Sequence, residues 1–135
     1  RRCKDILDCI IKYPNKKHFC IFDELYSGTN PYEAISSAYS YLNYISKNDN
    51  VRFLLTTHYI KLCNLFKERK EPKGSKEPRV INKSMKTHED VSKNPIYTYE
   101  ITNGVSTTKG GVSVLKNLDY PQKIIDLTIN ILEQI

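Results

Sequence analysis

One stretch of the sequence decides the fold: His18-Phe19-Cys20-Ile21-Phe22-Asp23-Glu24-Leu25-Tyr26-Ser27-Gly28-Thr29-Asn30-Pro31. A short apolar run, residues 19–22, ends in two adjacent carboxylates, Asp23 and Glu24. Because the run is continuous rather than alternating, it predicts a strand that is buried on both faces of a sheet. Charged groups at the tip of such a strand are costly unless something compensates them. Open α/β sheets bind ligands at the carboxyl ends of their strands, so the stretch predicts a metal–phosphate site there.

A second, mostly apolar run, residues 51–57, ends at His58, and a helix-length segment, residues 31–46, separates the two runs. The order of strand, helix and strand predicts a right-handed βαβ crossover with parallel strands. Asp23, Glu24 and His58 would then emerge at the same edge of one sheet. In nucleotide hydrolases an aspartate at this place holds Mg²⁺, and a neighbouring glutamate can polarise the attacking water.

Several segments share their order and spacing with one known family. They are Asp23-Glu24-x-x-x-Gly28-Thr29, Thr56-Thr57-His58-Tyr59, Tyr97-Thr98-Tyr99-Glu100-Ile101-x-x-Gly104-Val105-Ser106, Gly110-Gly111-Val112-Ser113-Val114-Leu115 and Tyr120-Pro121-x-x-Ile124-Ile125. Together they resemble the MutS family of DNA mismatch-repair ATPases, which belongs to the wider ABC-type ATPase class. The resemblance covers nearly the whole chain. It implies an α/β fold that is part of a P-loop NTPase (ABC-type) domain, with a parallel βαβ core followed by a β-strand pair and C-terminal helices.

The resemblance also implies roles for the residues at the strand ends. Asp23 and Glu24 would form the Walker B motif, in which Asp23 binds Mg²⁺ through water and Glu24 is the general base. His58 would be the switch histidine that senses the γ-phosphate. The alternatives are an exposed strand-end carboxylate for Asp23 and a core-capping histidine for His58.

The loop after the carboxylates is similar to the family's D-loop, which faces the nucleotide of a partner subunit. Its predicted nucleotide-binding residues are Gly28, Thr29 and Asn30. The implied cofactors are ATP and Mg²⁺. The implied partners of the full-length protein are a second MutS-like subunit, in a dimer, and mismatched or structured DNA.

The same loop departs from the family pattern. Mismatch-repair members usually show Gly-Arg-Gly-Thr-Ser-Thr after the carboxylates and then an Asp-Gly pair. This chain has Tyr26-Ser27-Gly28-Thr29-Asn30-Pro31 and then Glu33-Ala34. The difference indicates a divergent MutS-related branch in which the ATPase residues are kept.

A phosphate-binding loop of the form Gly-x-x-x-x-Gly-Lys-Ser/Thr does not occur in the sequence. The nearest segment, residues 104–111, has its lysine before the glycine pair and no buried parallel strand leading into it. Most backbone donors for the phosphates are then missing. We therefore expect residues 1–135 to be the C-terminal part of a MutS-type ATPase domain without its Walker A half. We expect this chain alone neither to bind ATP tightly nor to hydrolyse it.

Length and composition set wider limits. A chain of 135 residues predicts one domain at most. The net charge of +6 suits a nucleic-acid partner, but much of the basic excess falls in residues 67–79, whose Pro72, Gly74 and Pro78 predict a mobile loop. The four cysteines show no Cys-x-x-Cys pair or zinc spacing, which favours an intracellular protein with reduced thiols. No apolar run approaches the roughly 20 residues of a membrane span, so we expect no membrane partner.

The remaining elements follow from periodicity. Helices are predicted at residues 1–13, 60–66, 111–118 and 121–135, and an antiparallel strand pair at residues 80–85 and 96–101. Two other functions stay open at this point. One is a divergent ABC-type ATPase in recombination or chromosome maintenance, and the other is a non-catalytic dimerisation module with a relic site.

Overall fold

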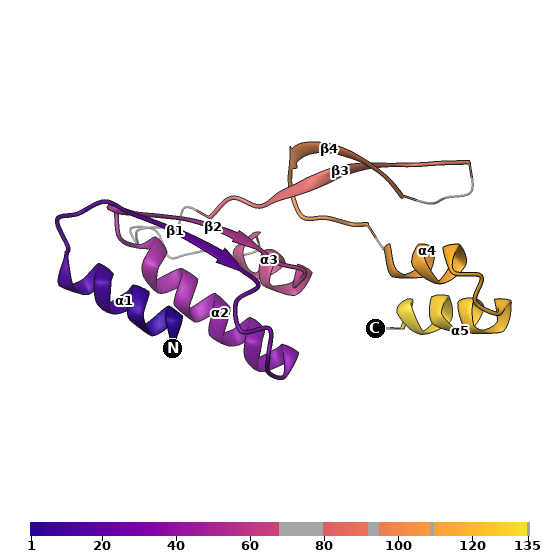
Figure 1. Cartoon of the computed structure of the whole chain (residues 1–135), viewed down its shortest axis with the longest axis horizontal. Helices are drawn as coiled ribbons and strands as arrows, with labels where there is room; N and C mark the ends of the chain where they lie inside the picture. The colour runs from indigo at the N-terminus through magenta and orange to yellow at the C-terminus, as the bar shows by residue number, and fades with distance from the viewer. Residues whose placement is uncertain (68–79, 92–94, 109, 135) are drawn as a thin grey trace. The chain divides into compact units, whose positions relative to one another are not determined.

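The computed structural model describes residues 1–67, 80–91, 95–108 and 110–134 (Figure 1). The loop predicted at residues 67–79 lies outside the described residues, except for its first residue, Lys67, which ends a helix. The chain divides into two compact units, residues 1–82 and 83–135, where length alone predicts at most one domain. We describe each unit by itself.

The first unit contains the predicted βαβ arrangement. Its elements are α1 (Arg2–Lys12), β1 (His18–Asp23), α2 (Pro31–Ser46), β2 (Val51–Thr56) and α3 (Ile60–Lys67). β1 and β2 pair in parallel, in register from His18 opposite Val51 to Asp23 opposite Thr56. The α/β class and the parallel strand pair are thereby confirmed, and the carboxyl ends of both strands meet at one edge.

Helix α2 begins where its sequence predicts. The Asn30 side chain accepts a hydrogen bond from the Tyr32 N–H at 2.9 Å, which satisfies one of the orphan donors of the first turn. Pro31 occupies the first turn, where its missing N–H costs nothing. The buried face of α2 consists of Ala34, Ala38, Leu42 and Ile45. Most of these residues join the core cluster of the first unit, together with apolar residues of β1, β2 and α3.

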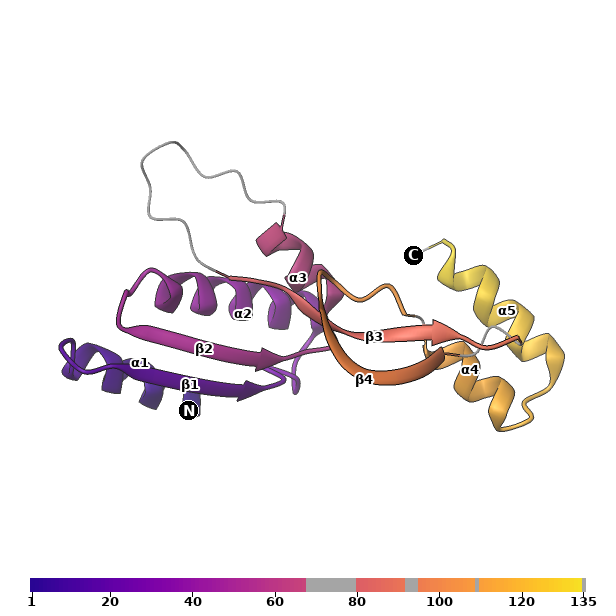
Figure 2. The same ribbon diagram turned by 90° about the horizontal axis from the view of Figure 1, so that it is seen from above.

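The helices of the first unit cover only one of the two faces of the strand pair. α1 and α2 lie on the same side of β1 and β2 (Figures 1 and 2), and Cys20 and Phe22 are buried on that side. On the other face Phe19 and Ile21 are each 69% exposed. The prediction that β1 is buried on both faces is therefore wrong for this structure. A continuous apolar run indicates a strand with two apolar faces, but the described residues of the first unit cover only one of them.

The second unit contains β3 (Lys83–Glu89), β4 (Pro95–Asn103), α4 (Gly110–Asn117) and α5 (Gln122–Leu132). β3 and β4 form the predicted antiparallel pair, with a register shift between Met85 and Thr87. The predicted bounds of β3 are wrong, because the strand starts at Lys83 and continues to Glu89. Backbone pairing with the long strand β4 sets these limits, since β3 itself is polar and has no apolar pattern of its own.

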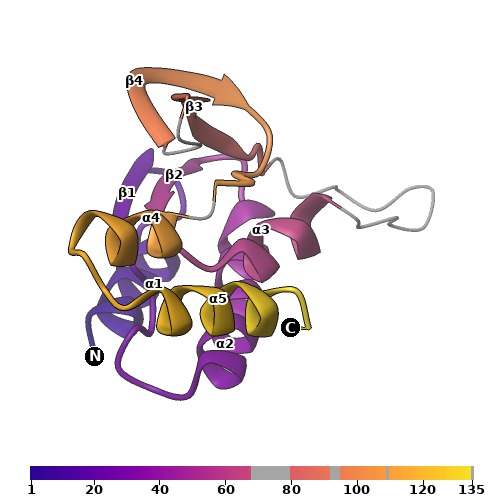
Figure 3. The same cartoon turned by 90° about the vertical axis from the view of Figure 1, so that its right-hand side faces the viewer.

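The helices α4 and α5 lie side by side (Figure 3). α5 begins one residue after Pro121, which is its N-cap, and ends at Leu132. Ile125 is the one buried apolar side chain among the described residues of this unit. In the described part of the chain, no helix combines the length and hydropathy that crossing a membrane requires.

Candidate functional site

The site lies at the carboxyl ends of the two parallel strands. Asp23 ends β1 directly opposite Thr56, the last residue of β2, and the Thr56 hydroxyl donates a hydrogen bond to Asp23 Oδ1. By strand alternation Asp23 shares the uncovered sheet face with Phe19 and Ile21. This register therefore presents the Asp23 carboxylate to solvent with one oxygen held by a neighbour.

Glu24 and His58 meet next to Asp23. The Glu24 N–H donates to the Thr56 carbonyl at 3.0 Å, which extends the strand pairing by one residue. Glu24 Oε1 lies 2.8 Å from His58 Nδ1. Because a carboxylate oxygen accepts, Nδ1 carries the proton of this bond. The structure thus brings together the three residues predicted for one sheet edge.

The Glu24–His58 pair is open to solvent. The side chain of His58 is 61% exposed and that of Glu24 is 46% exposed. The His58 ring rests against the Tyr59 ring, with centroids 4.4 Å apart. The alternative of a core-capping histidine is therefore wrong. An exposed pair of this kind contributes about 0–1 kcal/mol to stability, so the fold does not depend on it.

The backbone that carries Glu24 is strained. Glu24 and Tyr26 have φ values of 49° and 61°, in the left-handed region, although neither is glycine. This conformation costs an L-residue roughly 1–2 kcal/mol. Leu25, between them, is buried in the core cluster of the first unit. Strain of this kind persists only where the surroundings hold it, and it is concentrated at functional sites.

Tyr26 lies near α1, because the Cys3 side chain contributes to the raised pKa of the Tyr26 hydroxyl. The Tyr41 hydroxyl, from α2, donates to the Cys3 carbonyl at 3.0 Å. Burial raises the pKa of both tyrosines, and the nearby Cys3 thiol raises it further. Sequence reasoning gave no role to Tyr26 or to Thr56. A signal for Tyr26 was present, because it stands where the mismatch-repair pattern has a glycine.

The three residues of the predicted D-loop lie in the turn between β1 and α2. Asn30 uses its side chain as the cap of α2, and the Thr29 hydroxyl donates to Glu33 Oε2 at 3.1 Å. A Cβ added at Gly28 would meet open space, so the packing of this chain does not require a glycine there. Gly28, Thr29 and Asn30 are all exposed and are not in the cluster formed by Asp23, Glu24 and His58.

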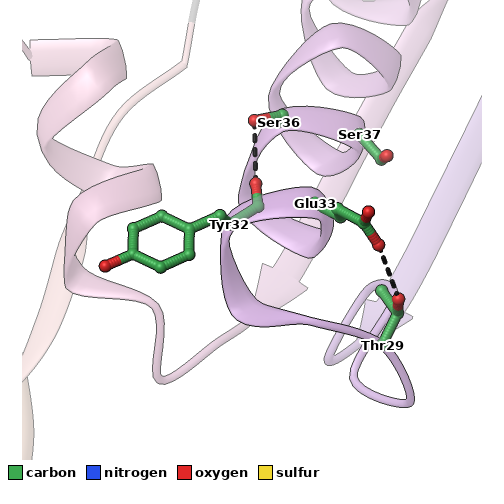
Figure 4. Close-up of a pocket in the computed structure, with 5 residues that line it drawn as sticks. All are labelled: Thr29, Tyr32, Glu33, Ser36 and Ser37. Carbon is green, nitrogen blue, oxygen red and sulfur yellow. Dashed lines mark hydrogen bonds between the residues drawn. The ribbon is translucent and has the colours of Figure 1, made fainter.

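A pocket of about 500 Å³ opens beside this turn (Figure 4). It is lined by Thr29, Tyr32, Glu33, Ser36 and Ser37. Two of its hydroxyls already have partners, since Thr29 bonds to Glu33 and the Ser36 hydroxyl donates to the Tyr32 carbonyl at 2.8 Å. The pocket thus lies beside the first turns of α2.

The donor set suits a metal that keeps its water. In the parts of the chain that the structure describes, no group of three or more His, Cys, Asp or Glu side chains could hold a metal ion. Mg²⁺ does not require such a group, because it usually keeps several waters and binds one or two carboxylates together with substrate phosphates. The exposed Asp23 carboxylate at the strand end fits that role. All four cysteines are free thiols.

Comparison with known families decides the affiliation. The model of MutS domain V matches residues 5–135. The chain belongs to the MutS family. The matched part is the C-terminal ATPase domain of that family, so the resemblance of the sequence is confirmed.

Individual relatives agree with this affiliation. The chain is 29% identical over 126 residues to the DNA mismatch repair protein MutS of Fusobacterium nucleatum, covering 93% of the chain and 13% of the relative. It is 31% identical over 126 residues to the DNA mismatch repair protein MutS of Clostridioides difficile, covering 93% of the chain and 12% of the relative. It is 28% identical over 122 residues to the DNA mismatch repair protein Msh3 of Mus musculus, covering 86% of the chain and 11% of the relative. The chain thus spans about an eighth of the length of these relatives. These matches do not favour the two alternative functions.

Proposed function

We propose that this chain supplies the hydrolytic residues of the ATP site in a MutS-type DNA mismatch repair protein. The observation that carries the proposal is the 2.8 Å contact between Glu24 and His58 beside Asp23, at the carboxyl ends of parallel strands in a MutS family chain. The surrounding architecture would be a P-loop, ABC-type fold. Its phosphate-binding loop would come from outside these 135 residues.

Asp23 would hold Mg²⁺ through bound water. The Thr56 hydroxyl bonds to one carboxylate oxygen and thereby orients the group at the strand end. When bound, Mg²⁺ would neutralise charge that develops on the phosphate oxygens. The contribution of Asp23 and Thr56 is a fixed anionic position at the sheet edge.

Glu24 would accept the proton of the attacking water. Its N–H bond to Thr56 and its bond to His58 hold the carboxylate at the strand end. His58 would contact the γ-phosphate through Nε2, because Nδ1 is engaged with Glu24. For Nε2 to donate a hydrogen bond while Nδ1 also donates, the ring must carry both protons. His58 would in this way connect the phosphate to the general base.

The turn with Gly28, Thr29 and Asn30 would face the nucleotide of a second MutS-like subunit. Its exposure, and the open space at Gly28, leave room for the approach of another chain. ATP binding would close the two subunits and change their grip on mismatched or structured DNA. An intracellular location belongs to the same proposal.

The test is ATP hydrolysis by the full-length protein and its Glu24→Gln variant. Loss of a positioned general base lowers turnover by about 100- to 10,000-fold. Because the Glu24–His58 pair is exposed, the variant should fold and should still bind ATP. Nucleotide binding by calorimetry and turnover by phosphate release separate these two properties. Measurements with matched and mismatched duplex DNA then report the coupling to DNA.

The matched control is Glu100→Gln, which makes the same chemical change in the second unit and should keep turnover. Turnover lost in Glu24→Gln and altered by a mismatch supports the proposal. Turnover that is indifferent to a mismatch keeps the ATPase and removes mismatch recognition. Absence of turnover in the unsubstituted protein would overturn the proposal in favour of a non-catalytic dimerisation module.

A further inference from the structure

His58 reaches Glu24 from a short turn between β2 and α3. The Thr57 hydroxyl accepts a hydrogen bond from the Tyr59 N–H at 3.1 Å, so this bond spans His58. Threonine makes such bonds to the backbone two residues further on in turns. The N–H of Ile60 donates to the His58 carbonyl at 3.0 Å. The backbone on both sides of His58 is therefore held by local hydrogen bonds.

Tyr59 anchors this turn to the rest of the first unit. Its side chain is half-buried and packs against the core cluster. Its carbonyl accepts hydrogen bonds from the N–H groups of Leu62 and Cys63, at 3.0 and 3.3 Å, in the first turn of α3. Tyr59 is thus held through its ring and its carbonyl independently of Thr57. The bond from the Tyr59 N–H to Thr57 joins the end of β2 to this anchored residue.

Two groups contact the ring of His58. The centroid of the Tyr59 ring lies 4.4 Å from that of the His58 ring, and the two planes are inclined by 46°. Glu24 Oε1 lies 2.8 Å from His58 Nδ1. The His58 side chain is 61% exposed, so the core does not enclose the ring. The position of the ring therefore depends on the turn from which it projects.

The two threonines at the end of β2 serve different parts of the site. The exposed Thr56 donates its hydroxyl proton to Asp23 on the neighbouring strand. The half-buried Thr57 accepts a bond from the backbone of its own turn. Because the Thr57 bond is to the backbone and not to a carboxylate, its effect on hydrolysis would pass through His58.

We propose that Thr57 is a positioning residue, whose hydroxyl holds the Tyr59 N–H and thereby fixes the turn that sets the His58 ring against Glu24. The proposal rests on the proposed ATP hydrolysis for its kinetic consequence. Its structural consequence, a fixed turn at residues 57–60, holds independently of any activity. Without the hydroxyl, His58 Nδ1 would leave Glu24 Oε1 more often, and the link from the phosphate to the general base would weaken.

The test uses Thr57→Val in the full-length protein, because valine keeps the branched side chain and removes the hydroxyl. Loss of one hydrogen bond of ordinary strength should speed amide hydrogen exchange at residues 58–60 by about two- to tenfold. It should lower kcat for ATP hydrolysis by a similar factor and change KM by less than about twofold. Thr57→Ser keeps the hydroxyl and should keep both properties. Thr57→Ala is a second variant without the hydroxyl and should agree with Thr57→Val.

Two further variants show whether Thr57 acts through His58. In the His58→Ala background, Thr57→Val should lower kcat no further, because the residue that it positions is gone. Thr98→Val is the matched control, since the Thr98 hydroxyl accepts the Glu100 N–H at 3.2 Å in the same two-residue pattern within β4. This control should change neither kcat nor exchange at residues 58–60.

The outcomes separate this inference from the proposed function. Unchanged exchange in Thr57→Val overturns the hydrogen-bonded turn. Faster exchange with unchanged kcat overturns the positioning role. That role also fails if kcat falls equally in the His58→Ala background, or if KM and the thermal midpoint change in parallel with kcat. If the unsubstituted protein hydrolyses no ATP, the proposed function and the positioning role fail together, and hydrogen exchange then tests the turn alone.

Discussion

The two units of this chain belong to one family domain but are packed very differently. The match to MutS domain V runs through both units. Among the described residues, every buried apolar side chain except Ile125 lies in the first unit. There, two helices cover one face of a strand pair. The second unit is a two-stranded ribbon and two short helices whose large apolar side chains are mostly exposed, including Tyr99, Ile101, Leu118 and Leu127.

The two units differ in how much of their stability they supply themselves. A lone two-stranded hairpin is marginally stable in water, and isolated helices shorter than about 12 residues are marginal as well. α4 and α5 have 8 and 11 residues. The described residues of the second unit therefore depend on apolar burial that they do not supply to one another. The first unit carries both its own core and the candidate site.

The largest effect is expected from removing the centre of the first core. Leu42 in α2 is 1% exposed. Leu42→Ala should lower the free energy of unfolding by about 2–5 kcal/mol, because it deletes buried methyl groups and leaves a cavity. Urea denaturation of the chain, followed by circular dichroism, measures this loss.

The matched variant in the second unit is Leu127→Ala in α5, where the side chain is 62% exposed. It should change the free energy of unfolding by less than about 0.5 kcal/mol. If Leu127→Ala costs as much as Leu42→Ala, the second unit has a packed core of its own, and the contrast between the units is wrong.

An intermediate effect is expected from Tyr41, which belongs to the tightly packed unit. Burial raises its pKa above the ordinary value of 10.0. The unfolded chain therefore releases this proton at lower pH than the folded chain does. The stabilising contribution is complete below about pH 10 and is lost as the pH rises further.

Tyr41→Phe tests this dependence. At neutral pH it should cost about 0.5–1.5 kcal/mol, because the bond to the Cys3 carbonyl is lost. Above pH 10 it should show a smaller alkaline loss of stability than the unsubstituted chain. Urea denaturation at pH 8 and at pH 10.5 gives the change in the free energy of unfolding with pH for each protein, with the exposed Tyr44→Phe variant as control. An equal change with pH in all three proteins would mean that the hydroxyl of Tyr41 is not held in a buried position.

The sequence predicted the first unit well because three signals agree there. Apolar runs mark β1 and β2, a cap with proline marks the start of α2, and the order of elements requires parallel strands. The meeting of Asp23, Glu24 and His58 followed from that topology alone. The exposure of Phe19 and Ile21 did not, because the described residues of the first unit cover only one face of the strand pair.

The sequence was less informative where backbone geometry decides. β3 is polar, and its limits are set by pairing with β4 rather than by a side-chain pattern. The left-handed backbone at Glu24 and Tyr26 was not predicted from the sequence, because neither residue is a glycine. The Thr56 hydroxyl contact depends on strand register, which the two apolar runs did not specify.

The smallest effect on stability is expected from exposed ion pairs, which occur in both units. Lys86 and Glu100 form an exposed pair at 3.2 Å between β3 and β4, and Lys4 and Asp8 form an exposed i,i+4 pair in α1. Each pair should contribute less than about 0.5 kcal/mol in a double-mutant cycle, and less still at high salt, because solvent screens exposed charges. The contrast between the units is one of apolar burial, so it should vanish for surface charges. Lys86 and Glu100 could instead show a coupling energy above about 1 kcal/mol while Lys4 and Asp8 do not. The strand pair would then hold its charged side chains more rigidly than α1 holds its own. In that case apolar packing would not be the property that separates the two units.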